Sequence, residues 1–91
     1  MIMKVKSGFV LRKIGDQYIA VPVGSRTREL HGMIALNETG AFLWKKLETE
    51  QTTETLRNLL AEEYEVDTDH AQESVNRFLE LLSENGVLEK E

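Results

Sequence analysis

The residues of this chain that could perform chemistry are two histidines, four serines and sixteen carboxylates, and there is no cysteine. The usual zinc sites need three or four ligands from His, Cys or carboxylate, and neither His31 nor His70 has such neighbours in the sequence. None of the serines has a sequence context that indicates an activated nucleophile. No glycine-rich phosphate loop follows an expected strand. The sequence therefore predicts a protein that is not an enzyme and that uses no metal or cofactor.

Charge is unevenly distributed along the chain, whose formal net charge is -5. Residues 1–36 carry six basic and two acidic side chains, whereas residues 37–91 carry five basic and fourteen acidic ones. An acidic half argues against nucleic acid as a partner, because phosphate neutralisation supplies most non-specific affinity. The basic N-terminal part favours attraction of an acidic peptide, and a solvated surface without a partner is the alternative.

The length of 91 residues and the hydrophobic fraction of 41% predict one soluble domain, 1–91. Without cysteines, packing alone must hold this domain together. No stretch approaches the ~18 consecutive apolar residues that span a bilayer, and Met1–Lys6 lacks the apolar run of a signal peptide. These features predict a cytoplasmic protein that does not bind membranes.

Three short strands are expected in the N-terminal part, at about 9–14, 18–23 and 33–36. The first two are rich in β-branched and aromatic residues, and Gly15–Gln17 between them is a hairpin signal, because glycine accepts the positive φ of a tight turn. Ile19, Val21 and Val23 alternate along the second strand, which predicts a half-buried sheet. Residues 24–32 are polar and bounded by glycines, which predicts a loop.

Three helices are expected in the rest of the chain, at about 38–48, 53–64 and 68–85. The capping residues expected before them are Asn37, Thr52 or Thr53, and Asp67. Asn85-Gly86 indicates the end of the last helix, since glycine suits the left-handed position there. Gly40 inside the first helix costs about 1 kcal/mol relative to alanine, which predicts a close packing contact at this position.

Three strands followed by three helices define an α+β domain. The short connection between the second and third helices is typical of a helix-turn-helix unit. The predicted fold is therefore α+β and winged helix-turn-helix-like, with a three-stranded antiparallel sheet followed by three helices. This fold makes a DNA-binding regulator an alternative function. However, Asp67 and Asp69 at the N-terminal end of the third helix would be repelled by phosphates.

One edge of a three-stranded sheet lacks a partner unless something covers it. The segment Met33, Ile34, Ala35 and Leu36 carries neither charge nor proline, which usually protect such an edge. The functional hypothesis is that a guest peptide adds a strand here. Two alternatives stay open. The segment is a core strand covered by a helix, or it pairs with a second copy of the chain as an oligomerisation module.

The third helix offers a second wall for such a site. The residues on one flank of its expected core stripe are His70, Ser74, Arg77 and Leu81. This flank is partly apolar and partly polar, as the wall of a peptide groove would be. The alternative is that Leu81 only widens the core stripe and that Arg77 pairs with Glu73 or Glu80.

A resemblance to a known family covers about residues 8–89. The segment Leu36–Trp44, LNETGAFLW, closely resembles a fairly specific segment of the PqqD family. Residues 60–67 (LAEEYEVD), 75–82 (VNRFLELL) and 85–88 (NGVL) also resemble that family, although this second region is partly generic amphipathic helix.

The resemblance implies a non-catalytic protein with a winged-helix-like fold and no cofactor. Members of the family bind the leader of a ribosomally made precursor peptide and present it to a modifying enzyme, often a radical-SAM protein. The leader lies as an added strand against the third strand, in a groove bordered by the third helix. On this chain the resemblance places the site at Met33–Leu36, with Arg77 and Leu81 as wall residues, in a monomer or homodimer. Asn37–Trp44 is expected to serve the fold, through a cap, a small residue and aromatic core anchors.

Overall fold

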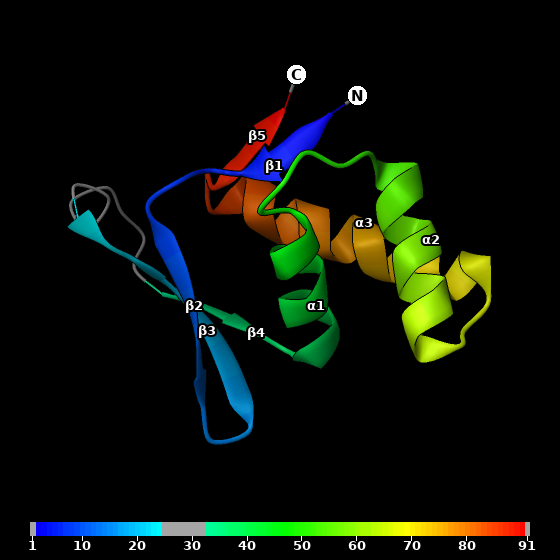
Figure 1. Ribbon diagram of the computed structural model, residues 1–91, viewed down its shortest axis with the longest axis horizontal. Helices are drawn as coiled ribbons and strands as arrows, with labels where there is room; N and C mark the ends of the chain where they lie inside the picture. The colour runs from blue at the N-terminus through cyan, green and yellow to red at the C-terminus, as the bar shows by residue number, and fades with distance from the viewer. Residues whose placement is uncertain (1, 25–32, 91) are drawn as a thin grey trace.

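The computed structural model describes residues 2–24 and 33–90 and places a hairpin-based sheet beside a group of helices (Figure 1). The elements in chain order are β1 Met3–Val5, β2 Phe9–Ile14, β3 Gln17–Pro22, β4 Ile34–Leu36, α1 Glu38–Lys46, α2 Thr53–Tyr64, α3 Thr68–Glu84 and β5 Leu88–Lys90. The predicted α+β fold, in which a three-stranded antiparallel sheet precedes three helices, is confirmed. Apart from Gly24, the predicted loop at 24–32 lies outside the described residues.

A second, two-stranded sheet was not predicted. β1 and β5 pair antiparallel, with Met3 opposite Lys90 and Val5 opposite Leu88, so the two ends of the described chain lie side by side (Figure 1). The Met3 backbone also exchanges two hydrogen bonds with Gln51, at 2.8 and 2.9 Å. The N-terminal strand thus joins the C-terminal strand to the segment that precedes α2.

The β2–β3 hairpin determines which backbone groups point toward β4. Its loop has two residues, Gly15–Asp16, and the glycine has a φ of 63°, as this kind of tight turn requires. In such a hairpin the closing residues, Ile14 and Gln17, form a hydrogen-bonded pair, and hydrogen-bonded pairs then recur at every second position. The bond of 2.8 Å from the Val23 amide to the Gly8 carbonyl follows this alternation.

The sheet buries one face against the helices. Ala20 is fully buried and lies opposite Ile34, which is also buried. Because successive side chains of a strand point to opposite faces, Ile19 and Val21 lie on the outer face, where they are half-buried. The expectation of a half-buried sheet is correct, but the face buried in the core carries Ala20 and not the series from Ile19 to Val23.

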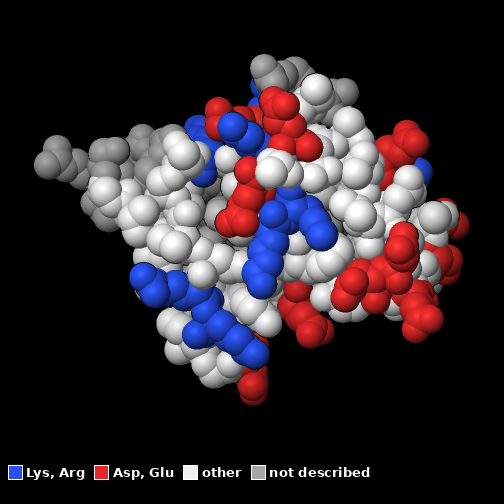
Figure 2. Space-filling model, viewed as in Figure 1, with Lys and Arg blue, Asp and Glu red and all other residues white. Residues whose placement is uncertain are grey.

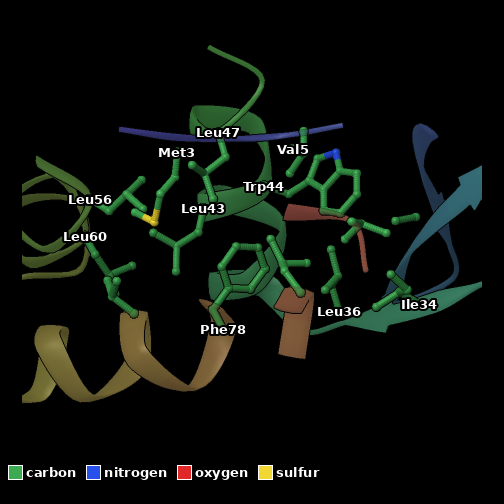
Figure 3. Close-up of a cluster of buried hydrophobic side chains, with 14 of the residues drawn as sticks. Met3, Val5, Ile34, Leu36, Leu43, Trp44, Leu47, Leu56, Leu60 and Phe78 are labelled. Carbon is green, nitrogen blue, oxygen red and sulfur yellow. The ribbon is translucent and has the colours of Figure 1, made fainter. Parts of the chain in front are cut away.

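The hydrophobic core joins both sheets to all three helices. Figure 3 shows its side chains converging from β1, β4, α1, α2 and α3. Trp44 lies among them with 1% of its surface exposed, and its ring meets the Phe9 ring edge-on at 6.0 Å between centroids. The aromatic anchor of α1 thus connects β2 to the helices.

Side-chain caps begin each helix at the predicted residue. The Asn37 carboxamide oxygen accepts from the Gly40 amide at 2.8 Å, and Thr52 and Asp67 cap α2 and α3 in the same way. A Cβ at position 40 would lie 3.1 Å from Oδ1 of Asn37 and 3.4 Å from Cβ of Leu36. The predicted close contact at Gly40 is therefore present, and it draws the first turn of α1 against the end of β4.

Asn37→Ala is expected to lower the free energy of unfolding by about 1 kcal/mol, because the Gly40 amide loses its acceptor. Asn37→Asp is the matched control and should change stability much less, since aspartate caps about as well as asparagine. Urea denaturation of the three proteins measures the difference. An alanine variant as stable as the aspartate variant would contradict this role for Asn37.

Candidate functional site

β4 is an edge strand of the three-stranded sheet, whose order is β2-β3-β4. It pairs antiparallel with β3 through Tyr18 opposite Leu36, Ile19 opposite Ala35 and Ala20 opposite Ile34. Within residues 2–24 and 33–90, no strand pairs with its other side. Of the alternatives left open for this segment, the structure shows a strand whose side chains at 34 and 36 reach the core and whose second backbone edge pairs with no strand of the described residues.

The hairpin register identifies the residue that faces this open edge. Hydrogen-bonded pairs between β2 and β3 fall at Gln17, Ile19 and Val21, so Tyr18 and Ala20 direct their backbone groups toward β4. Their partners Leu36 and Ile34 therefore bond to β3. Ala35 lies between these two and directs its N–H and C=O away from β3. The open edge thus presents one donor and one acceptor at Ala35, beside a small, exposed side chain.

A groove of about 210 Å³ lies between β4, the first turn of α1 and one face of α3. The residues that line it are Ala35, Leu36, Asn37, Thr39, Gly40, Ser74, Arg77, Phe78 and Leu81. The members from α3 recur at helical spacing, which places them on one face of that helix. β4 and α3 run in opposite directions across Figure 1. The groove therefore has a backbone edge on one side and a mixed apolar and polar helix face on the other.

The structure brings most of the predicted site residues together. Those that line the groove are Ala35, Leu36, Ser74, Arg77 and Leu81. Met33 and Ile34 are not in the lining. Met33 is 65% exposed just before β4, and the Ile34 side chain is buried in the core. His70 is also outside the lining. Its Nδ1 lies 2.9 Å from Oδ2 of Asp67 at the start of α3.

Sequence reasoning missed four groove residues. They are Asn37, Thr39, Gly40 and Phe78. The first three belong to the segment that was expected to serve the fold alone. The signal that could have found them is position: α1 begins directly after the edge strand, so its first turn must lie at the end of that strand. Phe78 packs in the core and also lines the groove, so it lies at the border of the two.

Arg77 carries the only formal charge among the described residues that line the groove. Its guanidinium donates from Nη2 to the carboxylate of Glu73, one turn earlier on α3, and the two side chains are 76% and 58% exposed. Of the two expected partners, the structure therefore shows Glu73. Because exposed ion pairs contribute about 0–1 kcal/mol, this pair leaves Arg77 available to a ligand.

Basic and acidic side chains are partly separated on the face shown in Figure 2, although the basic residues include some of α1, which belongs to the more acidic part of the chain. Figure 2 shows Lys and Arg side chains over the β2–β3 hairpin and α1, and Asp and Glu side chains over α2, with further acidic groups at the top of this view and at the tip of the hairpin. Lys46 is one of the basic residues of α1, and its Nζ lies 5.2 Å from the centre of the Phe42 ring. The acidic groups on this face thus lie mainly away from the hairpin.

Asp67 and His70 form a local pair at the N-terminus of α3. The backbone amide of His70, and then its side chain, lower the pKa of the Asp67 carboxyl below its ordinary value of 3.8. The hydrogen bond to Asp67 raises the pKa of the His70 imidazole above 6.5. The His70 contribution to stability is thus complete below pH 6.5 and is lost as the pH rises through the raised pKa. The Asp67 contribution is present above pH 3.8 and is lost as the pH falls through the lowered pKa.

Asp67→Asn is expected to return the pKa of His70 toward 6.5, because the neutral amide can still cap the helix but cannot stabilise the imidazolium ion. Proton NMR titration of the imidazole in both proteins measures this change. Glu54→Gln, on α2, serves as the control for loss of one negative charge. A His70 pKa that is the same in the wild type and in Asp67→Asn would contradict the pairing.

Neither a metal-binding cluster nor a membrane-spanning helix occurs within the described ranges. Residues 2–24 and 33–90 contain no group of three or more His, Cys, Asp or Glu side chains arranged to hold a metal ion. No helix in this part of the chain combines the length and apolar character needed to cross a bilayer.

Comparisons with known proteins identify the family of this chain and a solved structure of similar fold. Residues 17–88 match the family described as "Coenzyme PQQ synthesis protein D (PqqD)". A solved structure described as "TbiB1 in Complex with the TbiA(beta) Leader Peptide" is similar in fold, with a TM-score of 0.73 and 22% sequence identity over 97% of this chain and 96% of that chain. No curated protein sequence matches. Because the family match spans most of the chain, from β3 through all three helices, this protein belongs to the PqqD family.

Proposed function

We propose that this protein binds the leader of a ribosomally made precursor peptide as an added strand on β4. It presents this leader to a modifying enzyme, of the radical-SAM type, and does not itself catalyse a reaction. The observation that carries the proposal is the open edge of β4 at Ala35, directly beside the groove against α3. Membership of the PqqD family supports it, and the TbiB1 structure of similar fold contains a leader peptide.

The two sides of the groove have different roles in binding. Backbone hydrogen bonds along an edge strand give affinity that depends little on sequence, and side-chain pockets give specificity. Ala35 supplies the donor and acceptor for the first part. Leu36, Phe78 and Leu81 supply apolar surface for the second, with Ser74 and Arg77 as polar groups at the same wall. Met33 and Ile34 extend the edge, so a longer guest strand would run past them.

Isothermal titration calorimetry tests the binding step. The probe is the synthetic N-terminal half of a short open reading frame encoded beside this gene, and the control is a scrambled peptide of the same composition. We expect saturable binding of one native peptide per chain and none of the scrambled one. Equal heats from the two peptides, or none from either, would contradict specific leader binding.

Presentation to an enzyme is tested separately by gel filtration. The enzyme encoded in the same neighbourhood, this protein and the peptide are expected to elute together as one complex. Omission of this protein should leave the peptide unbound or more weakly bound to the enzyme. Co-elution of enzyme and peptide that is unaffected by this protein would contradict the presenting role.

The same open edge also fits a second copy of this chain, which would make the protein an oligomerisation module. Strand pairing between copies would occupy Ala35 and compete with the peptide. Light scattering over a range of concentrations, with and without peptide, separates the two cases. We expect a monomer at concentrations where peptide binds, and a peptide-resistant dimer would favour the oligomerisation function.

A further inference from the structure

We propose that the groove recognises two side chains of the bound strand that are two residues apart. One is apolar and lies against Leu36, Phe78 and Leu81, and the other is a carboxylate that pairs with Arg77. This inference rests on the proposed function and extends it by naming the class of peptide. The peptide is an extended segment with the pattern apolar–any–acidic, in which the apolar and the acidic residue can come in either order.

The register of β4 determines which guest side chains enter the groove. Opposed residues of neighbouring strands point their side chains to the same face of a sheet, in parallel and antiparallel pairs alike. The guest residue opposite Ala35 therefore points to the outer face, with the exposed Ala35 side chain. The guest residue opposite Leu36 points to the helix side, where Leu36 itself is buried. Only every second residue of the guest thus meets α3.

The guest side chain opposite Leu36 meets three apolar residues of the groove. Leu36 and Phe78 are 5% and 6% exposed, and Leu81 is half-buried, so all three present a remaining apolar surface to the groove. A guest side chain opposite Leu36 covers this surface and removes it from water. Because burial of a large apolar side chain is favourable, this position selects an apolar residue.

The spacing of residues along α3 predicts that the second guest side chain is acidic. Arg77 precedes Leu81 by four residues, which is about 6 Å along a helix, and two residues of a strand span about 6.6–6.8 Å. A strand that runs beside α3 therefore brings alternate side chains to successive turns of the helix. Arg77 is the only charged group among the described lining residues. Only one of its five N–H donors is needed for the bond to Glu73, so the others can bind a guest carboxylate.

The side on which the acid lies also follows from the fold. β4 and α3 run in opposite directions in Figure 1, so the earlier turns of α3 lie toward the end of β4, where α1 begins. Thr39 and Ser74 line this end of the groove with Arg77. The Ser74 hydroxyl supplies a further donor for the same carboxylate.

Peptide display tests the inference even while the sequence of the leader is unknown. A library of random 15-residue peptides is selected separately on the wild type, Arg77→Ala, Arg77→Glu and Arg57→Glu. Arg57→Glu, on α2, is the matched control because that residue does not line the groove. Circular dichroism checks that each variant is folded.

We expect the wild type and the Arg57→Glu protein to enrich apolar–any–acidic peptides. Arg77→Ala should keep the apolar preference and lose the acidic one, and Arg77→Glu should select lysine or arginine in place of the acidic residue. Peptides selected on the wild type should bind Arg77→Ala about 2- to 5-fold more weakly, as expected for loss of one exposed ion pair.

The outcomes separate this inference from the proposed function. Enriched peptides without a fixed two-residue spacing, or an acidic preference that persists on Arg77→Glu, would overturn the inference and leave strand addition standing. If no peptide is enriched on the wild type, or if the enriched peptides bind an Ala35→Pro variant equally well, the proposed strand addition is itself contradicted, and the inference fails with it.

Discussion

Replacement of Ala35 with proline is expected to weaken leader binding about 10- to 100-fold. Proline has no backbone N–H, so the guest carbonyl that would accept from residue 35 stays unpaired. The proline ring would also stand at the open edge, where natural proteins place proline to block added strands. The fold should remain intact. The Ala35 amide points away from β3, so no bond of the existing sheet is lost. Ile34 before it is already in a strand, which suits a residue that precedes proline.

Ala35→Val is the matched control for this substitution. Valine keeps the amide donor and favours a strand, and its side chain would point to the outer face of the sheet, as that of Ala35 does. Calorimetry with the leader peptide and thermal unfolding of both variants complete the test. Strong peptide binding by a folded Ala35→Pro protein would show that the peptide does not pair with this edge. Loss of folding in Ala35→Pro alone would contradict the register derived from the hairpin.

Trp44→Ala is expected to lower the free energy of unfolding by about 3–5 kcal/mol, the usual cost of removing a buried Trp side chain. The Trp44 ring is 1% exposed and packs edge-on against Phe9, so its loss leaves a cavity where α1 meets β2. Small domains of this size have total stabilities of about 5–15 kcal/mol. The substitution should therefore leave a barely stable protein, with a midpoint of thermal unfolding lowered by more than ~10 °C.

Lys45→Ala is the neighbouring control, because Lys45 is exposed on the same helix. It should change stability by less than about 0.5 kcal/mol, as surface substitutions usually do. Thermal and urea unfolding of both variants measure the two effects. A small loss for Trp44→Ala would mean that the contact between α1 and the sheet contributes little to the fold.

Local signals were sufficient to predict the three-stranded sheet and the helices. Capping side chains at Asn37, Thr52 and Asp67 act within three residues of each helix start, so sequence alone reveals them. The Gly15–Asp16 turn is equally local. The β1–β5 pair could not be predicted in this way. Each strand has three residues, too few to show a period, and their pairing joins opposite ends of the chain.

The site was predictable where it depended on helical spacing or on the absence of edge protection. The helical wheel of α3 predicts Ser74, Arg77 and Leu81, and the unprotected strand predicts Ala35. His70 lies on the same flank of that wheel, but its position one turn earlier engages it with Asp67 at the helix start. Phe78 could be placed only once the packing of α3 on β4 was seen, because a side chain at the border of core and groove has the same sequence pattern as a core residue.

The alternation of hydrogen-bonded and non-hydrogen-bonded pairs in the β2–β3 hairpin identifies the residue at the open edge. With a two-residue loop, Tyr18 and Ala20 direct their backbone groups toward β4. Their partners Leu36 and Ile34 therefore bond to β3, and Ala35 directs its backbone groups away from β3.

Backbone amide NMR of the labelled protein, titrated with the leader peptide, tests strand addition most directly. We predict that the largest shift changes fall at residues 33–37 and along Ser74, Arg77 and Leu81, with the Ala35 amide becoming protected from hydrogen exchange. Amides of α2 should change little. Peptide binding that leaves the Ala35 amide unshifted and unprotected, with the largest changes elsewhere, would contradict strand addition at β4.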